Sequence, residues 1–245
     1  MNTRIIAHRG ASAEAPENTM AAFELALRQG AQMIEFDVRP TRDDAIVVFH
    51  DDTTERWNGR TEAVGALTLA ELQAIDLRGE RAPILDEVCA WARETGLLLN
   101  VEIKVAGIEA AVARTIHKHR IGEQVIISSF DPAALRAMRE VAPELARAAL
   151  TDSSAMPPVD DTTWPLGTLA QLGARAWHPS WRLPPLEMLI PDVRQAGYAV
   201  NVWTVDDPAI MRRLLVLEVE GIMTNRPALL AEVMRDWSAA GSSAT

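Results

Sequence analysis

LLLNVEIKVAGIEAAVARTIHKHRIGEQVIISSF, residues 97–130, contains the pattern that decides the fold. The apolar run Leu97–Lys104 and the Val- and Ile-rich run Val125–Phe130 have the composition and length of buried strands. Between them, Ile108–His119 places apolar residues at the spacing of one helix face. Parallel strands need a long crossover, usually a helix, so this order predicts a parallel β-α-β unit.

The same alternation extends in both directions along the chain. The other strand candidates are Ile5–Arg9, Met33–Val38, Arg147–Thr151, Arg175–Pro179, Ala199–Val205 and Gly221–Asn225. The other helix candidates are Asn18–Gln29, Leu85–Thr95, Pro132–Val141, Leu166–Leu172, Leu186–Gln195, Pro208–Leu217 and Pro227–Trp237. Strict alternation of eight strands and eight helices predicts an α/β protein with a closed (β/α)8 TIM barrel, formed by one domain over residues 1–245.

One strand-like run, Ala45–His50, breaks this alternation. Too few residues separate it from Val38 for a parallel crossover, and the intervening Arg42-Asp43-Asp44 is typical of a turn. We therefore predict an antiparallel hairpin that grows from the second barrel strand. Such a hairpin returns His50 to the level of the second strand's end.

Two further segments lie outside the regular alternation. Residues 51–82 form a long connection with one helical turn at Leu69–Ile75, and we expect this connection on the active-site side of the barrel. The small and polar residues 238–245 predict a flexible tail.

Composition limits the classes of function. The formal net charge is −10, whereas nucleic-acid-binding proteins usually carry a basic face, so we expect a small-molecule substrate and no nucleic-acid partner. The single cysteine, Cys89, stands in an apolar run and predicts a buried, unreactive thiol. Without a signal-like segment or a run of roughly 18 apolar residues, we expect a cytoplasmic protein with no membrane insertion. The oligomeric state stays open.

Polar groups gather at the carboxyl ends of the first strands, where barrel enzymes carry their catalytic residues. These ends read His8-Arg9, Glu35-Phe36-Asp37 and Glu102-Ile103-Lys104, with His50 at the end of the hairpin arm. Alternation along a strand places both carboxylates of Glu35-Phe36-Asp37 on one face. Burying unpaired charge against the helices is costly, so we expect the charged side chains to point into the barrel mouth.

Carboxylates that converge at the mouth would repel one another unless a cation balanced them. Mg²⁺ and Ca²⁺ bind oxygen ligands. We therefore predict one divalent ion, Mg²⁺ or Ca²⁺ with Mn²⁺ as an alternative, held by Glu35, Asp37 and Glu102. Arg9 and Lys104 flank these ligands and are suited to binding a phosphate. The competing interpretation is ion pairing of the carboxylates with Arg9, Lys104 and Arg39.

Two of the five histidines, His8 and His50, stand beside this predicted metal site. They suit a general base and a general acid, and we interpret His8 as the base and His50 as the acid, while the reverse assignment stays open. His117 and His119 lie at a polar helix end and are interpreted as solvated or as partners of the helix dipole. For His178, a pocket-lining role and a structural role both stay open.

Tryptophans supply the candidate apolar contacts of the site. Trp203 shares the inward face of its strand with Asn201 and is predicted to form a substrate-binding wall, with barrel packing as the alternative. Trp57, Trp177 and Trp181 are further candidates for the mouth.

The order of these motifs resembles the glycerophosphodiester phosphodiesterase family from the first strand to the last. The motifs are Ala7-His8-Arg9-Gly10, Ala15-Pro16-Glu17-Asn18-Thr19, Ile34-Glu35-Phe36-Asp37-Val38, Val48-Phe49-His50-Asp51-Asp52, Val101-Glu102-Ile103-Lys104, Ser128-Ser129-Phe130 and Val202-Trp203-Thr204-Val205. The resemblance implies hydrolysis of glycerophosphodiesters to sn-glycerol 3-phosphate and an alcohol. It implies the same acid/base, metal-binding and phosphate-binding roles for the residues named above. The chain is more similar to the cytoplasmic bacterial members of the family than to the periplasmic ones.

Three positions depart from the pattern usual in that family. Arg56-Trp57-Asn58-Gly59 stands where relatives often have Thr-Thr-Asn-Gly, and Ile84 stands where threonine is common. Thr224-Asn225-Arg226-Pro227 stands where many relatives have an aspartate before the arginine or proline. We expect none of these to touch the catalytic residues, and we expect them to affect substrate preference alone.

Two alternative functions are weighed beside hydrolysis. One is a phospholipase-D-like lyase of the same superfamily, which stops at a cyclic phosphate. The other is a non-catalytic barrel that binds phosphorylated head groups, and the complete set of histidines and carboxylates disfavours it. For the hydrolase, the nucleophile is either water or the 2-hydroxyl of the glycerol.

Overall fold

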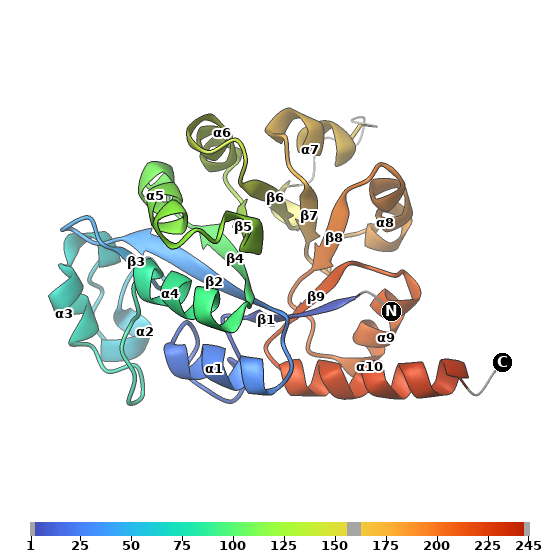
Figure 1. Ribbon diagram of the computed structural model, residues 1–245, viewed down its shortest axis with the longest axis horizontal. Coiled ribbons are helices and arrows are strands. Elements are labelled where there is room, and N and C mark those ends of the chain that lie inside the picture. Colours follow the sequence, from blue (N-terminus) through green and yellow to red (C-terminus); the bar gives the residue numbers. More distant parts are fainter. Residues whose placement is uncertain (1–2, 156–162, 243–245) are drawn as a thin grey trace.

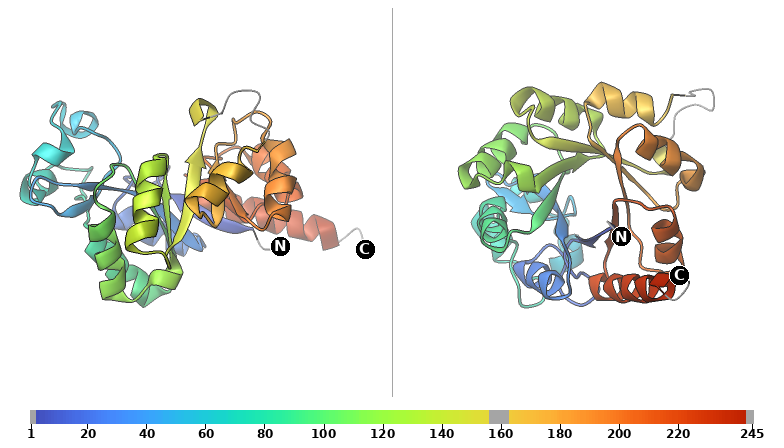
Figure 2. Two further views of the ribbon diagram at one scale, coloured as in Figure 1. Left: turned by 90° about the horizontal axis from the view of Figure 1, so that it is seen from above. Right: turned by 45° about the vertical axis from the view of Figure 1, so that its right-hand side comes forward.

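In the computed structural model, which describes residues 3–155 and 163–242, parallel strands form a closed barrel surrounded by helices (Figures 1 and 2). The barrel strands are β1 (Arg4–His8), β2 (Met33–Pro40), β4 (Leu98–Ile103), β5 (Val125–Ser129), β6 (Ala146–Thr151), β7 (Ala176–Pro179), β8 (Ala199–Val202) and β9 (Gly221–Thr224). β1 pairs in parallel with both β2 and β9, which closes the ring. The predicted (β/α)8 barrel is confirmed.

Helices form the outer layer. They are α1 (Met20–Arg28), α4 (Leu85–Thr95), α5 (Glu109–His119), α6 (Pro132–Val141), α7 (Leu166–Leu172), α8 (Leu186–Gln195), α9 (Pro208–Val216) and α10 (Pro227–Ser242), with short 3-10 turns η2 (Gly122–Gln124) and η3 (Ser153–Ala155). An aspartate cap followed by proline starts both α6 and α9. Within the described ranges, no helix is long and apolar enough to cross a membrane.

The main apolar core lies between the strands and the helices. Phe23, Phe36 and Trp177 are among its largest fully buried side chains. Cys89 is buried in the same cluster, as predicted. Burial and the charge of Asp86 raise the pKa of the Cys89 thiol to about 12, so the thiol stays protonated at neutral pH.

The predicted hairpin after the second strand is confirmed. β3 (Ile46–Val48) runs antiparallel to the end of β2, with Val38 opposite Val48. The backbone N–H of Phe49 donates to the carbonyl of Asp37 at 3.0 Å. This contact holds the following residue, His50, beside the strand end that carries Asp37.

Residues 51–82 form an insert that projects beyond β2 and β3 (Figure 1). It contains α2 (Glu55–Asn58), η1 (Val64–Ala66) and α3 (Leu69–Gln73). A capping box formed by Thr68 and Glu71 stabilises the start of α3. The insert has its own apolar cluster, which consists of Val47, Phe49, Val64, Leu72, Leu77 and Ala82. Val48 belongs instead to the main core, so neighbouring side chains of β3 pack into two separate cores.

The end of the last helix corrects one expectation. α10 ends at Ser242, whereas the sequence predicted an end at Trp237 and a flexible tail over 238–245. Ala239 and Ala240 favour helix and no proline follows Trp237, so the helix meets no stop signal there. Residues 243–245 of the predicted tail lie outside the described residues.

Candidate active site

A pocket of about 190 Å³ opens at the carboxyl ends of the barrel strands, the expected position of an active site in this fold. Its lining residues are His8, Arg9, Glu35, His50, Glu102, Lys104, Phe130, Leu150, Trp203 and Met223. Seven of the eight predicted site residues are therefore in one pocket lining. The eighth, Asp37, lies against Arg9 and Lys104.

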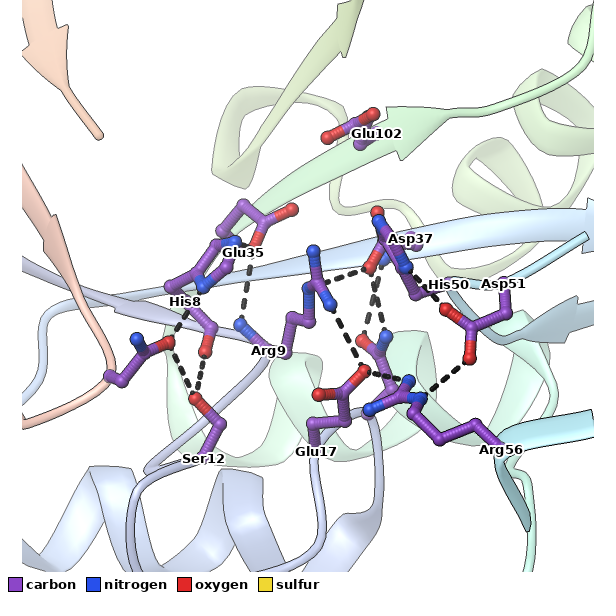
Figure 3. Close-up of polar contacts among 12 residues, drawn as sticks. His8, Arg9, Ser12, Glu17, Glu35, Asp37, His50, Asp51, Arg56 and Glu102 are labelled. Carbon is purple, nitrogen blue, oxygen red and sulfur yellow. Dashed lines mark hydrogen bonds and ion pairs between the residues drawn. The ribbon is translucent and has the colours of Figure 1, made fainter. Parts of the chain in front are cut away.

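Three carboxylates converge at the polar side of this pocket (Figure 3). Glu35, Asp37 and Glu102 each offer one oxygen, and these oxygens lie within 4.8 Å of one another. Glu35 and Asp37 share a face of β2, and Glu102 is opposite Asp37 in the register of β4. Their exposures are 3, 1 and 8 %. Three buried oxygen donors at this spacing could hold a divalent ion.

The charges of the three carboxylates are not balanced within the protein. Burial and the charges of Asp37 and Glu102 raise the pKa of Glu35 well above its usual value. Burial and the charge of Asp37 raise the pKa of Glu102 to about 7. For Asp37 burial also opposes ionisation, but the charges of Arg9 and Lys104 hold its pKa below its usual value. A bound cation favours the charged form of every ligand.

The two cations contact the carboxylates from both sides. Arg9 Nε lies 3.3 Å from Asp37 Oδ2, and Lys104 Nζ lies 2.6 Å from Glu102 Oε1 and 3.5 Å from Asp37 Oδ1. The ion pairing that the sequence allowed as an alternative is thus present for two carboxylates. The Glu35 carboxylate instead accepts a hydrogen bond from the backbone N–H of Arg9 at 3.1 Å. Neither the Arg9 guanidinium nor the Lys104 ammonium forms one of these ion pairs with Glu35.

The turn that presents Arg9 depends on the next residue. Gly10 has a φ of 84°, and a Cβ added there would lie 2.7 Å from the backbone of Ala22. A larger side chain would therefore push β1 away from α1.

Asn18 is a site residue that the sequence analysis missed. Its Nδ2 donates to Asp37 Oδ2 at 2.9 Å, and the side chain is buried. The backbone of Asn18 is left-handed, with a φ of 57°, which asparagine tolerates better than most residues. The sequence predicts Asn18 as the start of a helix, whereas α1 begins at Met20, and the motif Glu17-Asn18-Thr19 is the signal that points to a site role.

His8, at the end of β1, is held by groups on both sides of its ring (Figure 3). Nε2 lies 3.9 Å from Glu35 Oε2, and Nδ1 lies 2.7 Å from Asn225 Oδ1. Burial, and then the charge of Arg9, lower the pKa of His8 to about 4. The ring is therefore neutral at pH 7 and able to accept a proton.

His50 has a carboxylate partner. Its Nδ1 lies 2.8 Å from Asp51 Oδ1, and Arg56 Nε donates to Asp51 Oδ2 at 2.6 Å. Arg56 Nη2 also reaches Glu17 Oε1 at 2.6 Å, which ties the insert to the loop after β1. Arg39 Nε donates to the carbonyl of His50 at 2.8 Å. An acceptor at Nδ1 places a proton there and fixes the orientation of the ring.

One departure from the family pattern contacts a predicted catalytic residue, and a second contacts the carboxylate partner of the other, which corrects our expectation. Asn225 contacts the His8 ring directly, and Arg56 holds Asp51 behind His50. Asn225 lies in the loop after β9 and Arg56 lies in the short helix α2 of the insert, and contacts between segments so far apart are not visible in the linear sequence. Ile84 pairs with Val47 in the hairpin and is not among the residues that line the pocket.

An aromatic pair stands on the apolar side of the pocket. Phe130 and Trp203 meet edge to face, with ring centroids 5.5 Å apart. Trp203 Nε1 also donates to the carbonyl of His178 at 2.7 Å. Trp203 therefore lines the pocket, as a substrate-binding wall would, and is also hydrogen-bonded to the barrel, as the packing interpretation predicts.

The other tryptophans lie away from this pocket. Trp177 is fully buried in the helix layer against Trp164, so its predicted place at the mouth is wrong. The reason is strand alternation, because Trp177 faces outward while its neighbour His178 faces inward. Trp57 and Trp181 line different surface hollows and are not in the lining of the active-site pocket.

The remaining histidines are not in the lining of the active-site pocket. His178 is fully buried and its Nε2 pairs with the Asn201 amide at 2.9 Å, which favours the structural interpretation. His119 is only 7 % exposed and lies 2.8 Å from Asp86, so of its two predicted interpretations solvation is wrong, whereas its place in the last turn of α5 agrees with the helix-dipole interpretation. His117 is at the exposed helix end and pairs with a surface glutamate.

Comparisons with known proteins identify the family of the chain. The sequence profile of the glycerophosphoryl diester phosphodiesterase family matches residues 8–229. A glycerophosphodiester phosphodiesterase of Caldanaerobacter subterraneus subsp. tengcongensis is 34 % identical, over 96 % of this chain and 99 % of its own length.

Solved structures show the same likeness over the whole barrel. The glycerophosphodiester phosphodiesterase of Agrobacterium tumefaciens is 30 % identical with a TM-score of 0.80, covering 94 % of this chain and 99 % of that one. An Oleispira antarctica phosphodiesterase in complex with the product sn-glycerol-3-phosphate is 26 % identical with a TM-score of 0.82, covering 95 % and 96 %. The chain therefore belongs to the glycerophosphoryl diester phosphodiesterase family.

Proposed function

We propose that the protein hydrolyses glycerophosphodiesters to sn-glycerol 3-phosphate and an alcohol, with one divalent metal ion and two histidines. The observation that carries this proposal is the convergence of three buried carboxylates, two cations and two histidines on one pocket. The product complex of the Oleispira antarctica relative supports the same substrate class.

The residues fit a hard divalent ion. Buried oxygen donors outnumber the two nearby cations, and the raised pKa values of Glu35 and Glu102 report the missing positive charge. We assign Glu35, Asp37 and Glu102 as the ligands and Mg²⁺ or Ca²⁺ as the ion, with Mn²⁺ as an alternative. When bound, such an ion polarises the phosphoryl oxygens.

The protein's own groups perform the remaining steps. Arg9 and Lys104 bind the phosphate and offset the charge that builds on its oxygens. His8 Nε2 accepts the proton of the nucleophile as its oxygen bonds to phosphorus. As the bond from phosphorus to the alcohol oxygen breaks, the His50 ring, which enters this step with a proton on both nitrogens, gives that oxygen the proton of Nε2 and keeps the one on Nδ1. Trp203 forms a wall against the carbon part of the substrate.

The cellular setting is also a proposal. The resemblance to cytoplasmic bacterial members supports a role in the cytoplasm, in the turnover of lipid-derived diesters to glycerol phosphate. Fractionation of the producing cell, with immunodetection of the protein in each fraction, tests this location.

One assay tests the activity. The purified protein is incubated with a panel of glycerophosphodiesters and Mg²⁺, Mn²⁺, Ca²⁺ or excess EDTA, and sn-glycerol 3-phosphate is measured with a coupled enzyme. We expect turnover with a divalent ion, complete loss with EDTA, and recovery when the ion is restored. Full turnover in EDTA, with no metal found by elemental analysis, would falsify the metal assignment.

Phosphorus NMR of the same reactions identifies the product. A monoester as the end product supports hydrolysis. A cyclic phosphate that accumulates and is not opened would instead assign the protein to the lyases of the superfamily. Binding of the diesters without any product would show a non-catalytic barrel.

A further inference from the structure

Behind His8 runs a chain of polar contacts that the proposed mechanism does not use. His8 Nδ1 lies 2.7 Å from Asn225 Oδ1, and Asn225 Nδ2 donates to Asp206 Oδ2 at 2.6 Å. The Ser12 hydroxyl lies 2.8 Å from the same Asn225 oxygen and 2.7 Å from the carbonyl of His8. These residues come from the ends of β1, β8 and β9, so the closure of the barrel brings them together.

The carboxylate at the far end of the chain is held in place by two further hydrogen bonds, and the backbone on either side of it is fixed as well. Asp206 Oδ1 accepts from the Thr224 hydroxyl at 2.9 Å and from the backbone N–H of Asn225 at 2.8 Å. The next residue, Asp207, caps α9, and the preceding Val205 donates its N–H to the carbonyl of Met223 at 2.8 Å. Asp206 is thus fixed to the β9 end of the barrel.

The orientation of the Asn225 amide follows from its partner. An ionised carboxylate can only accept hydrogen bonds, whereas an amide has one donating and one accepting end. Asp206 therefore requires the NH₂ group of Asn225 on its side. The amide oxygen must then face His8 and Ser12.

The tautomer of His8 follows from that orientation. An oxygen that can only accept lies 2.7 Å from Nδ1, so the neutral ring carries its proton on Nδ1. Nε2 then keeps its lone pair, and Nε2 is the nitrogen on the Glu35 side of the ring, 3.9 Å from Oε2.

We propose that Asp206 is a positioning residue that acts through Asn225 to keep the proton of His8 on Nδ1 and its proton-accepting nitrogen turned toward the substrate. The part of this inference that concerns turnover rests on the proposed function, because it takes His8 as the base. The part that concerns the tautomer does not. A catalytic histidine in the wrong tautomer can lose up to about 10⁴-fold in kcat, and outer partners of a site commonly contribute about 10- to 100-fold.

The test combines two isosteric variants with two measurements. In Asp206→Asn the new amide can donate or accept, so it no longer dictates how Asn225 is turned. The matched control is Asp207→Asn, which removes the same charge one residue away and keeps a side chain that can cap α9. Circular dichroism and thermal unfolding confirm that both variants are folded.

The first measurement is ¹⁵N NMR of histidine-labelled, Mg²⁺-loaded protein at pH 7.5, with the His8 signals assigned by their loss in His8→Gln. We expect an Nδ1–H tautomer for His8 in the wild type and in Asp207→Asn, and a mixture of tautomers in Asp206→Asn. An Nε2–H tautomer in the wild type overturns the proposal. So does a pure Nδ1–H tautomer in Asp206→Asn, whatever its activity.

The second measurement is steady-state kinetics on a glycerophosphodiester. Asp206→Asn should lower kcat by about 10- to 100-fold with KM within about twofold, because the variant leaves the phosphate-binding groups in place. Unchanged kcat despite a mixed tautomer overturns the link between the tautomer and turnover. A wild type without turnover on any diester rejects the proposed function, and the NMR result then decides the structural inference by itself.

Discussion

Two parts of the barrel bring different chemistry to one pocket: β1, β2 and β4 with the hairpin, called here the first half, and β5 to β9, called the second half. The ionisable lining residues come from β1, β2, the hairpin and β4, whereas β5 to β9 contribute the apolar lining residues Phe130, Leu150, Trp203 and Met223. In the first half, the charges of neighbouring buried carboxylates raise the pKa values of Glu35 and Glu102. In the second half, the buried His178 is paired with the neutral amide of Asn201. We infer that the first half supplies the reaction chemistry and that the second half shapes the space for the carbon part of the substrate.

The largest effect should come from the histidines of the first half. If His50 is the general acid, His50→Ala should lower kcat/KM by about 10²- to 10⁴-fold on diesters of choline or ethanolamine, which are poor leaving groups. The loss should be much smaller on a nitrophenyl analogue, which departs without protonation. His8→Ala, as the base, should be impaired on both substrates.

The exposed His117 provides the control for these variants, since His117→Ala removes a histidine from the outer end of α5 and should leave both rates unchanged. Equal losses for His50→Ala on the two substrates would reject its role as the acid. If instead His8→Ala regains its kcat/KM on the nitrophenyl analogue, His8 is the acid and His50 is the base.

The carboxylates of the first half should determine metal affinity. Glu35→Gln and Glu102→Gln each remove one ligand charge but keep the side-chain volume. We expect the affinity for Mg²⁺ or Ca²⁺ to fall by about 100-fold, because the loss of a residue that only hydrogen-bonds to a metal ligand already costs up to this much. Calorimetry at pH 8, above the pKa of about 7 for Glu102, measures this change. Glu220→Gln, next to Arg194 at the opposite end of the barrel, is the control. Unchanged affinity in both site variants would show that neither residue is a ligand.

In the second half, the buried His178 should affect stability instead of catalysis. Burial lowers its pKa from 6.5 to about 3. Between these values the unfolded chain binds a proton that the folded chain does not, so this contribution to stability is complete above about pH 6.5 and is lost as the pH falls. From pH 7 to pH 5 the loss should be about 2 kcal/mol in the free energy of unfolding.

Urea unfolding at these two pH values measures the loss. In His178→Gln the decrease between pH 7 and pH 5 should be smaller by that amount, whereas His117→Ala should keep the wild-type decrease. The same decrease in the wild type and in His178→Gln would contradict a neutral, buried His178.

The smallest effect should come from the aromatic pair of the second half. Phe130 is 41 % exposed and packs on Trp203 at the pocket, so Phe130→Ala should raise KM by about two- to tenfold, the worth of one aromatic contact, and leave kcat within about twofold. Val141→Ala, which truncates an exposed apolar residue on α6, is the control. A fall in kcat with no change in KM would place Phe130 with the reaction chemistry and weaken the division between the halves.

Much of the first half could be predicted from the sequence because strand geometry is local. The period of two along β2 and β4 places Glu35, Asp37 and Glu102 on the inward face, and the short turn after β2 requires an antiparallel return. These rules placed the carboxylates and His50 at the mouth. The same period, applied to β7, would have placed Trp177 outside the barrel.

The polar contacts behind the histidines could not be predicted in this way. Asp206 and Asn225 lie in loops, and Arg56 lies in α2, which has only four residues, so no sequence period relates these side chains to the histidines. Asn225 meets His8 217 positions away in sequence, and Arg56 meets Glu17 39 positions away. Such contacts depend on how the barrel closes and how the insert folds back over the mouth.

The division of β3 between two cores has an evolutionary consequence. Val48 packs into the barrel core, while Val47 packs into the small core of the insert. Selection can therefore lengthen, trim or exchange residues 51–82 as a module without disturbing the packing of the barrel. Substrate range and hydrolysis can then diverge at different rates in related genes. A change at Arg56 is the exception, because its guanidinium binds Asp51, which contacts His50, so substitution there affects a proposed catalytic residue.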